Sequence, residues 1–306
     1  MGLLNWLLKG RGFGTEELAR RLGTDLPQLE DVVPHYREFG IPKHSGGVRR
    51  IFAPAPDLKT LQRRILRRLL ARLRAHPAAT AYERGRSIVT NARAHQAQAV
   101  VLRFDLVDFF PSTGEGRLRR YFRRIGWNRP ATQLLLRWCT YRGGLPQGAP
   151  TSPRLSNLVN YRLDARLSGM ATALGGVYTR YADDITISFA EDDRGKVMSV
   201  QRYVRQVVEQ EGYRLHRRKK QSVRRRHQRQ TVTGLVVNDR VNLPREVRRW
   251  LRAVEHRTQS GSVLSLRDYK PLERRSRKSP TLTPAQLEGW LALQSMVDRQ
   301  GRDRLV

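Results

Sequence analysis

The residues with the clearest chemical potential are two adjacent aspartates, Asp183 and Asp184, in the stretch YTRYADDITISFA. Carboxylates are depleted from β-strands, and burying them is costly unless they are paired or bind a metal. Both flanking segments, VYTRYA and ITISFA, are typical of strands, which places the pair at the tip of a hairpin. Because turns accept aspartate readily, the pair alone leaves a purely structural role open.

A third carboxylate favours a functional interpretation. Asp105 interrupts a second apolar stretch, VVLRFDLVDFF, whose near-continuous hydrophobicity indicates a strand covered on both faces. If both strands lie in one sheet, the aspartates can converge, and their oxygen atoms suit Mg²⁺. Two such ions can activate an attacking hydroxyl and stabilise a leaving phosphate oxygen. We therefore expect Asp105, Asp183 and Asp184 to hold two Mg²⁺ ions, with Asp105 and Asp183 bridging both ions and Asp184 more peripheral and more tolerant of substitution.

The composition predicts a polyanionic partner. The 306 residues include 59 Lys and Arg against 27 Asp and Glu, which gives a formal net charge of +32. Most of the excess is arginine, which binds phosphate through a planar fork of donors, so nucleic acid is the leading candidate. A solvated basic surface in an arginine-rich sequence is the alternative. The apolar fraction of 39% is that of a globular protein.

The only cysteine is Cys139, so the chain cannot form an intrachain disulfide or a cysteine-based zinc site. A reducing cytoplasm fits this composition, and Cys139 is expected to be a small core residue. The apolar run at the start, MGLLNWLLKG, is too short for a signal peptide or a membrane span. We expect a cytoplasmic protein without membrane contact.

The elements that must position these residues alternate between helices and short strands. Helical patterns occupy residues 15–38, 58–73, 117–140, 152–167, 195–212, 245–257 and 283–299. Hairpins are expected at residues 41–54, 177–190 and 231–243. Thr15 and Ser152 are the expected N-caps of their helices. This order predicts an α+β fold in which a small antiparallel sheet carries the chemistry.

Three stretches, FDLVDFF, LPQGAPTSP and YADD, resemble motifs A, B and C of reverse transcriptases in this order and spacing. In addition, NARAH at 91–95 resembles the NAxxH signature of retron reverse transcriptases, and VTG at 232–234 resembles their VTG signature. The resemblance covers residues from about 40 to 245, and beyond it only the basic, helical character is similar to a thumb. The chain is thus similar to the retron-type reverse transcriptases, which are bacterial RNA-directed DNA polymerases.

This resemblance implies a right-hand polymerase fold with fingers, a palm holding the small antiparallel sheet, and a helical thumb. The expected domains are a helical N-terminal extension at 1–40, fingers at 41–100 and 113–175, palm at 101–112 and 176–242, and thumb at 243–306.

The resemblance also implies a nucleotide site. Phe110 falls at the steric-gate position, where its ring would clash with a 2′-OH and so select deoxynucleotides. Gln147 would contact the nucleotide or a template base, and Gly148 would let the backbone come close. Arg49 and Arg50 would meet the triphosphate, or bind backbone phosphates instead.

Other residues have more open roles. Asp108 would line the triphosphate or cap a turn, and Lys219 would be the general acid for the leaving pyrophosphate, with Lys220 as its competitor. His216 stands where the family often has Asn and is expected to help bind RNA. Asn91 and His95 are interpreted as structural or RNA-contacting rather than catalytic. The full set expected to bind RNA is Asn91, His95, Arg217, Arg218, Arg224, Arg225 and Arg226.

As a retron-type enzyme, the protein would copy a dedicated structured non-coding RNA (the msr-msd type) with dNTPs. Synthesis would start from the 2′-OH of a guanosine and leave a branched RNA–DNA hybrid, msDNA. Such systems act in anti-phage defence, usually with an effector protein. The alternatives are a group II intron-like or other defence-associated reverse transcriptase and, in a different class, a non-catalytic RNA-binding scaffold with a polymerase fold.

Overall fold

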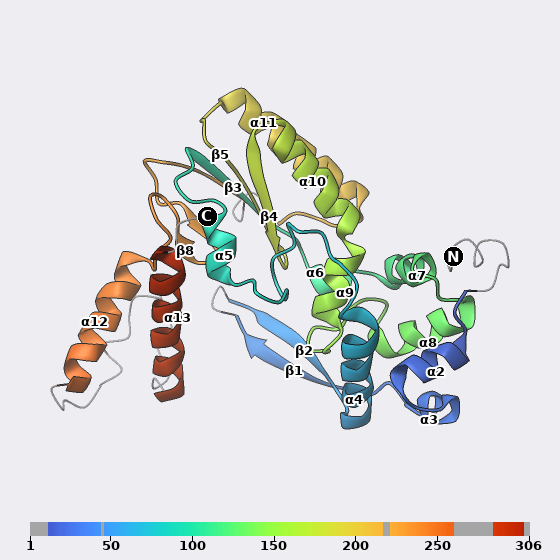
Figure 1. Ribbon diagram of the computed structural model, residues 1–306. Coiled ribbons are helices and arrows are strands. Elements are labelled where there is room, and N and C mark those ends of the chain that lie inside the picture. Colours follow the sequence, from blue (N-terminus) through green and yellow to red (C-terminus); the bar gives the residue numbers. More distant parts are fainter. Residues whose placement is uncertain (1–11, 44–45, 217–220, 260–283, 303–306) are drawn as a thin grey trace.

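The computed structural model describes residues 12–43, 46–216, 221–259 and 284–302 (Figure 1). Its centre is a four-stranded antiparallel sheet with the strand order β4-β5-β3-β6. The strands are β3 (Val100–Asp105), β4 (Gly176–Tyr181), β5 (Asp184–Phe189) and β6 (Ser222–Arg225). The two segments predicted to carry the aspartates are therefore neighbours in one small antiparallel sheet, as expected.

Both faces of this sheet are covered. Helices α10 (Tyr161–Ala173) and α11 (Arg194–Gln210) pack on one face, where Val204 joins a core with residues of β3, β4 and β5 (Figure 1). On the other face, Val101 of β3 packs with α5 (Ile88–Arg93). This double coverage explains the near-continuous apolar character of β3.

The N-terminal half of the chain forms a second core around several short helices. They are α2 (Thr15–Leu22), α3 (Leu26–Glu30), α4 (Pro56–Ile65), α7 (Glu115–Arg124), α8 (Arg129–Cys139) and α9 (Ser152–Val159). Helix α4 continues into a π-helical turn, η1 (Leu66–Leu70). The hairpin of β1 (Tyr36–Pro42) and β2 (Val48–Pro54) extends from this core (Figure 1). Cys139 is fully buried here, as predicted.

The C-terminal elements form a third core with α5. They are the short hairpin of β7 (Thr231–Val232) and β8 (Leu235–Val236), followed by α12 (Arg245–Gln259) and α13 (Pro284–Arg302). Trp250 and Trp290 hold the two helices together, with ring centroids 6.1 Å apart. Both helices agree with the sequence pattern. No helix within the described ranges is long and apolar enough to cross a membrane.

The prediction of helical structure over residues 15–38 is wrong after Glu30. Helix α3 ends at Glu30, and β1 already begins at Tyr36. The reason is local: Val33 precedes Pro34, and the proline ring disfavours the α conformation of the residue before it. The first hairpin is accordingly longer than the pattern 41–54 predicts.

Two predicted N-caps are displaced by one residue. The caps are Gly14 and Thr151, so Thr15 and Ser152 are the first residues of α2 and α9. The Ser152 hydroxyl instead donates to the carbonyl of Pro146, at 2.7 Å, and so fastens the preceding loop to the helix. Strand β6 was not predicted, because its sequence SVRR lies within a basic run.

Candidate active site

A cleft of about 950 Å³ lies between the β1–β2 hairpin and the end of the central sheet. Asp105 and Asp183 line it on the side of the sheet, and Arg49 and Arg50 line it on the side of β2. The other predicted nucleotide-site residues in its wall are Asp108, Phe110 and Gln147. Residues far apart in the sequence therefore meet at one site, as the motif pattern predicts.

The backbone fixes where the aspartates lie. Asp105 ends β3 and pairs directly with Asp184 at the start of β5, while Tyr181 pairs with Asp184 across the hairpin. Asp183 therefore occupies the two-residue tip, and its carbonyl accepts a hydrogen bond of 3.0 Å from the backbone N–H of Leu106. This bond joins the hairpin tip to the residue that follows Asp105, so both carboxylates reach the same cleft.

Asp184 is placed differently from the other two aspartates. It does not line the cleft, and the Arg103 guanidinium donates to both of its carboxylate oxygens, at 2.5 Å to Oδ2 and 3.4 Å to Oδ1. Arg103 lies two residues before Asp105 on the same strand, so its side chain emerges on the same face. This ion pair agrees with the peripheral role expected of Asp184.

The site disfavours negative charge in the free protein. Loss of water around Asp183, together with the neighbouring Asp105 charge, raises the pKa of its carboxyl above the ordinary value, although part of the side chain is exposed to the cleft. Desolvation also raises the pKa of Asp184, and Arg103 opposes this effect. Carboxylates that are costly to ionise are stabilised by a cation, and this is the electrostatic character of a metal site.

The described residues do not contain three Asp, Glu, His or Cys side chains gathered closely enough to hold a metal ion by themselves. Two carboxylates, Asp105 and Asp183, rather than the expected three, face the cleft. This donor set fits Mg²⁺, which commonly uses one or two protein carboxylates and completes its shell with water and substrate phosphate oxygens.

His216 lies against Asp105 instead of on an outer RNA-binding surface. Its Nε2 is 3.2 Å from Asp105 Oδ1, and its backbone N–H donates to the Asp105 carbonyl at 2.8 Å. The segment that follows α11 is thereby joined to the end of β3. Sequence reasoning placed His216 in the basic run and missed this contact, because it depends on the register between distant segments.

A buried ion pair supports the hairpin tip from the side of α10. Arg180 on β4 and Asp164 on α10 are both fully buried, and they form two hydrogen bonds of 2.7 Å. The Arg180 Nη1 also donates to the carbonyl of Ala182, at 3.0 Å. Ala182 has a positive φ of 56°, a strained conformation for a residue with a side chain. Arg180 therefore holds the turn that presents Asp183.

The opposite face of the hairpin is held by His95. Its ring lies between two hydroxyls, with Nδ1 2.7 Å from Ser188 Oγ on β5 and Nε2 2.8 Å from Thr179 Oγ1 on β4. One ring nitrogen donates and the other accepts, as a neutral imidazole allows. Burial lowers the pKa of His95 to about 3, so the ring is neutral at physiological pH.

The expectation that His95 and Asn91 bind RNA is corrected by their burial. Their exposed fractions are 0% and 1%, which leaves no surface for contact with a nucleic acid. Asn91 accepts a hydrogen bond from the Thr80 hydroxyl at 2.7 Å, and the Thr80 backbone N–H donates to the Arg180 carbonyl. The NARAH segment is therefore a structural brace for the β4–β5 hairpin, the other interpretation that the sequence left open.

Phe110 is partly exposed in the cleft wall, next to Tyr82, with ring centroids 6.3 Å apart. Tyr82 is 49% exposed and has a positive φ of 62°, which is unusual for an aromatic residue. Sequence reasoning did not select Tyr82. The only available signal was its place in a glycine-containing loop between two well-defined elements.

Gly148 is required by a contact within the protein. Its φ is 125°, and a side chain there would place its Cβ 2.8 Å from the carbonyl oxygen of Phe52 on β2. The Phe52 backbone N–H donates to the carbonyl of Gln147 at 2.8 Å, so the loop adds to the edge of β2. The close backbone approach predicted for Gly148 thus joins this loop to the hairpin, and it is Gln147 that reaches the cleft.

Asp108 follows β3 with a positive φ of 46° and stands at the N-cap position of the short helix α6 (Phe109–Ser112). Its side chain is exposed and forms no capping hydrogen bond. Of the two roles considered, lining the cleft is therefore the one that the side-chain position favours. Arg50 lies in the cleft wall 3.6 Å from Glu38 on β1.

The basic run is only partly available for RNA. Four residues of this run lie outside the described residues, namely Arg217, Arg218, Lys219 and Lys220. Arg224 is exposed on β6. Arg225 pairs with Asp192 at 2.6 Å, and Arg226 lies 3.7 Å from Asp239, so both have acidic neighbours.

Comparisons with known proteins agree with this geometry. The family model described as reverse transcriptase (RNA-dependent DNA polymerase) matches residues 41–251. The retron Ec86 reverse transcriptase of Escherichia coli is 33% identical over 260 residues, which cover 85% of this chain and 75% of that protein. The chain belongs to the retron reverse transcriptases. Polymerases of this family are generally metal-dependent, in agreement with the carboxylates in the cleft.

The retron Mx162 reverse transcriptase of Myxococcus xanthus is 40% identical over 286 residues, and these cover 80% of this chain. The retron Mx65 reverse transcriptase of the same organism is 39% identical over 267 residues. The alignments span 59% and 62% of these two relatives. A solved telomerase from Candida albicans, in complex with a fragment of telomeric RNA, is similar in fold, with a TM-score of 0.51 and 10% identity over 74% of this chain and 48% of that one.

Proposed function

We propose that this retron reverse transcriptase acts as an RNA-directed DNA polymerase that copies a dedicated structured non-coding RNA. The observation that carries the proposal is the convergence of Asp105 and Asp183 on a cleft whose other walls hold Arg49 and Phe110. Phosphoryl transfer needs little from a protein besides positioning and charge neutralisation, and these side chains are suited to both. The non-catalytic scaffold is disfavoured, because a scaffold has no use for a carboxyl such as that of Asp183, whose pKa is raised by loss of water at the edge of the cleft.

In this proposal, two Mg²⁺ ions held by Asp105 and Asp183 supply the positive charge that phosphoryl transfer needs. The guanidinium of Arg49 stabilises the negative charge of the bound triphosphate from the opposite wall. Phe110 lies beneath the sugar and excludes a 2′-OH. Gln147, fixed by its backbone contact with β2, orients the base or its template partner. Lys219 remains the proposed general acid for pyrophosphate.

The identity to proteins named retron reverse transcriptases supports a more specific product. We propose that synthesis begins at a guanosine 2′-OH of an msr-msd type RNA and yields msDNA, a branched RNA–DNA hybrid. The reaction would take place in the cytoplasm, as part of an anti-phage system with an effector protein. Domain limits follow the sequence-based proposal, except that the fingers begin with β1 at Tyr36.

Two measurements test this function. The purified protein should extend a DNA primer on an RNA template with Mg²⁺ and dNTPs, and the double variant Asp183→Asn/Asp184→Asn should not. Nucleic acid that copurifies from the native host should contain DNA that stays attached to RNA after denaturation. Extension by the double variant would refute the metal assignment. Copurification of bulk RNA without attached DNA would refute the retron product and favour the scaffold.

A further inference from the structure

Four arginines form a row on the outer side of α4 and the π turn η1. They are Arg63, Arg64, Arg67 and Arg68, and all of them are exposed. Leu58 and Ile65 lie on the other side of the same helix, are fully buried and belong to the N-terminal core. The row is therefore a solvent-facing surface, fixed in place by the packing of the helix that carries it.

These arginines have no acidic partner in the described part of the chain, because none of the ion pairs found there includes them. Some arginines elsewhere on the surface do have such a partner: Arg20 lies 2.7 Å from Glu17, and the half-buried Arg119 pairs with Glu115. Arginines four positions apart on a helix repel each other, so the row lowers the stability of the free protein. An anionic partner would remove that repulsion.

The arginine side chains and Thr60 line a groove of about 400 Å³. One end of the row is held by a second element. A Cβ at Gly23, the C-cap of α2, would lie 1.8 Å from Arg68 Nη1, so this guanidinium lies directly against the glycine backbone. The C-terminal end of a helix favours a cation. Arg68 is thus positioned before any partner binds.

We propose that this arginine row binds the phosphate backbone of a double-stranded stem in the RNA that the protein carries. The inference rests on the proposed function only in taking RNA as the partner. Guanidinium groups bind phosphate through charge-assisted hydrogen bonds. None of the described residues that line the groove is aromatic, so these residues offer no platform on which unpaired bases could stack. The contact is therefore with the backbone and is independent of sequence.

The position of α4 separates this surface from the catalytic cleft. In Figure 1, α4 stands at the base of the β1–β2 hairpin beside α2 and α8, on the side of the molecule away from α12 and α13. Among the residues that the structure describes, none of those lining its groove also lines the catalytic cleft. An RNA stem bound there lies on the outside of the molecule, while the copied strand occupies the cleft.

The test is the salt dependence of RNA binding by two double variants, Arg63→Gln/Arg67→Gln and Arg64→Gln/Arg68→Gln. The probe is a fluorescein-labelled RNA duplex of arbitrary sequence, and fluorescence anisotropy gives Kd over a series of KCl concentrations. Each phosphate contact contributes close to one unit to the slope of log K against log salt concentration. We expect each double variant to bind more weakly and to have a slope shallower by about 1.8 units.

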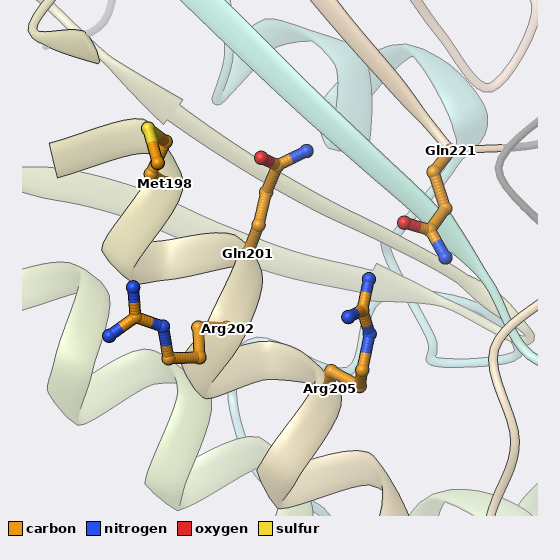
Figure 2. Close-up of a pocket in the computed structure, with 5 residues that line it drawn as sticks. All are labelled: Met198, Gln201, Arg202, Arg205 and Gln221. Atoms are coloured by element: carbon orange, nitrogen blue, oxygen red, sulfur yellow. The ribbon is translucent and has the colours of Figure 1, made fainter. Parts of the chain in front are cut away.

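A matched control is available on α11. Arg202 and Arg205 are exposed on this helix, and Figure 2 shows them beside Gln201, with Gln221 across a second groove of about 470 Å³. The variant Arg202→Gln/Arg205→Gln removes the same charge from a different surface, and we expect its slope to equal that of the wild type. An equal loss in this control would overturn the assignment to α4, because net charge alone would then explain the effect.

Two further results complete the test. If both α4 variants bound the duplex with wild-type affinity and slope, the proposal would be overturned. It would also be overturned if these variants lost as much affinity for unstructured oligouridylate as for the duplex, since the site would then not select duplex. Thermal melting of each variant confirms folding, and removal of the repulsion should leave Tm unchanged or higher. A wild-type protein that binds the duplex but extends no primer would refute the polymerase proposal and leave this site standing.

Discussion

Phe110 is the residue whose position makes the sharpest prediction. Its ring lies in the cleft wall beside Tyr82, on the short helix that follows Asp105. If it clashes with a 2′-OH, Phe110→Ala should raise the kcat/KM for ribonucleotides relative to deoxynucleotides by about tenfold or more. Single-nucleotide extension with each substrate measures this ratio. An active variant with wild-type sugar selectivity would show that another residue discriminates between the sugars.

The two neighbouring aspartates should respond unequally to substitution. Asp183 faces the cleft, whereas Asp184 is held by Arg103 outside it. We expect Asp183→Asn to lower kcat by about a hundredfold or more, the scale on which loss of one strong electrostatic contact to the transition state is felt. Asp184→Asn should lower kcat clearly less. Primer extension over a series of Mg²⁺ concentrations compares the two variants, and an equal loss of kcat in both would contradict the peripheral role of Asp184.

At this scale, sequence reasoning placed Asp183 from chain geometry, because the turn between two apolar strands puts it at the tip of a hairpin. Sequence reasoning selected Phe110 through the resemblance to motif A of reverse transcriptases. It did not find Arg103 beside Asp184, Arg180 beside Asp164, or His216 beside Asp105. Each of these contacts depends on strand register or on how a helix crosses the sheet, and no local pattern encodes either one.

At the scale of elements, the β4–β5 hairpin is held on both faces. Arg180 fastens one face to α10 and supports the strained turn at Ala182. His95 fastens the other face by binding one hydroxyl on each strand. Because the hairpin tip carries Asp183, these contacts outside the cleft determine how accurately the carboxylate is positioned. Arg180 and His95 are both buried, so they make the hairpin rigid and take no direct part in the chemistry.

The contribution of His95 should depend on pH. Burial lowers its pKa to about 3 in the folded protein, below the ordinary value for histidine. Its stabilisation is therefore fully present above the ordinary pKa and is lost as pH falls toward the folded value. We expect His95→Gln to destabilise the protein at pH 7 by about 1–3 kcal/mol, because buried hydroxyls lose their partner. Urea unfolding from pH 7 to pH 5 should show this difference shrinking, and a constant difference would contradict it.

The elements that the sequence predicted well are those whose pattern reflects packing on the sheet. Strands β3, β4 and β5 and helices α11 and α12 bury clear apolar faces. The helix predicted over residues 152–167 is instead two helices, α9 and α10. Strand β6 could not be recognised, because its sequence is basic and it exists only by pairing with β3. The π turn η1 was equally invisible, since its leucines continue the same stripe as α4.

At the scale of the whole molecule, the net charge of +32 has opposite consequences for the free protein and for its RNA complex. Like charges on a compact chain repel each other, and salt screens this repulsion. Bound RNA neutralises the same charges and stabilises the folded state in proportion to its affinity, which salt weakens. Salt should therefore stabilise the free protein and destabilise the complex.

We thus expect the Tm of the free protein to rise between low and moderate KCl, and the Tm of the protein with excess RNA duplex to fall toward the same value. Differential scanning fluorimetry on both samples measures the two curves, and they should meet where binding is lost. Excess polyglutamate, an anion without phosphate, serves as the comparison for charge alone. If Tm with RNA were independent of salt, phosphate contacts would not account for the positive charge of this chain.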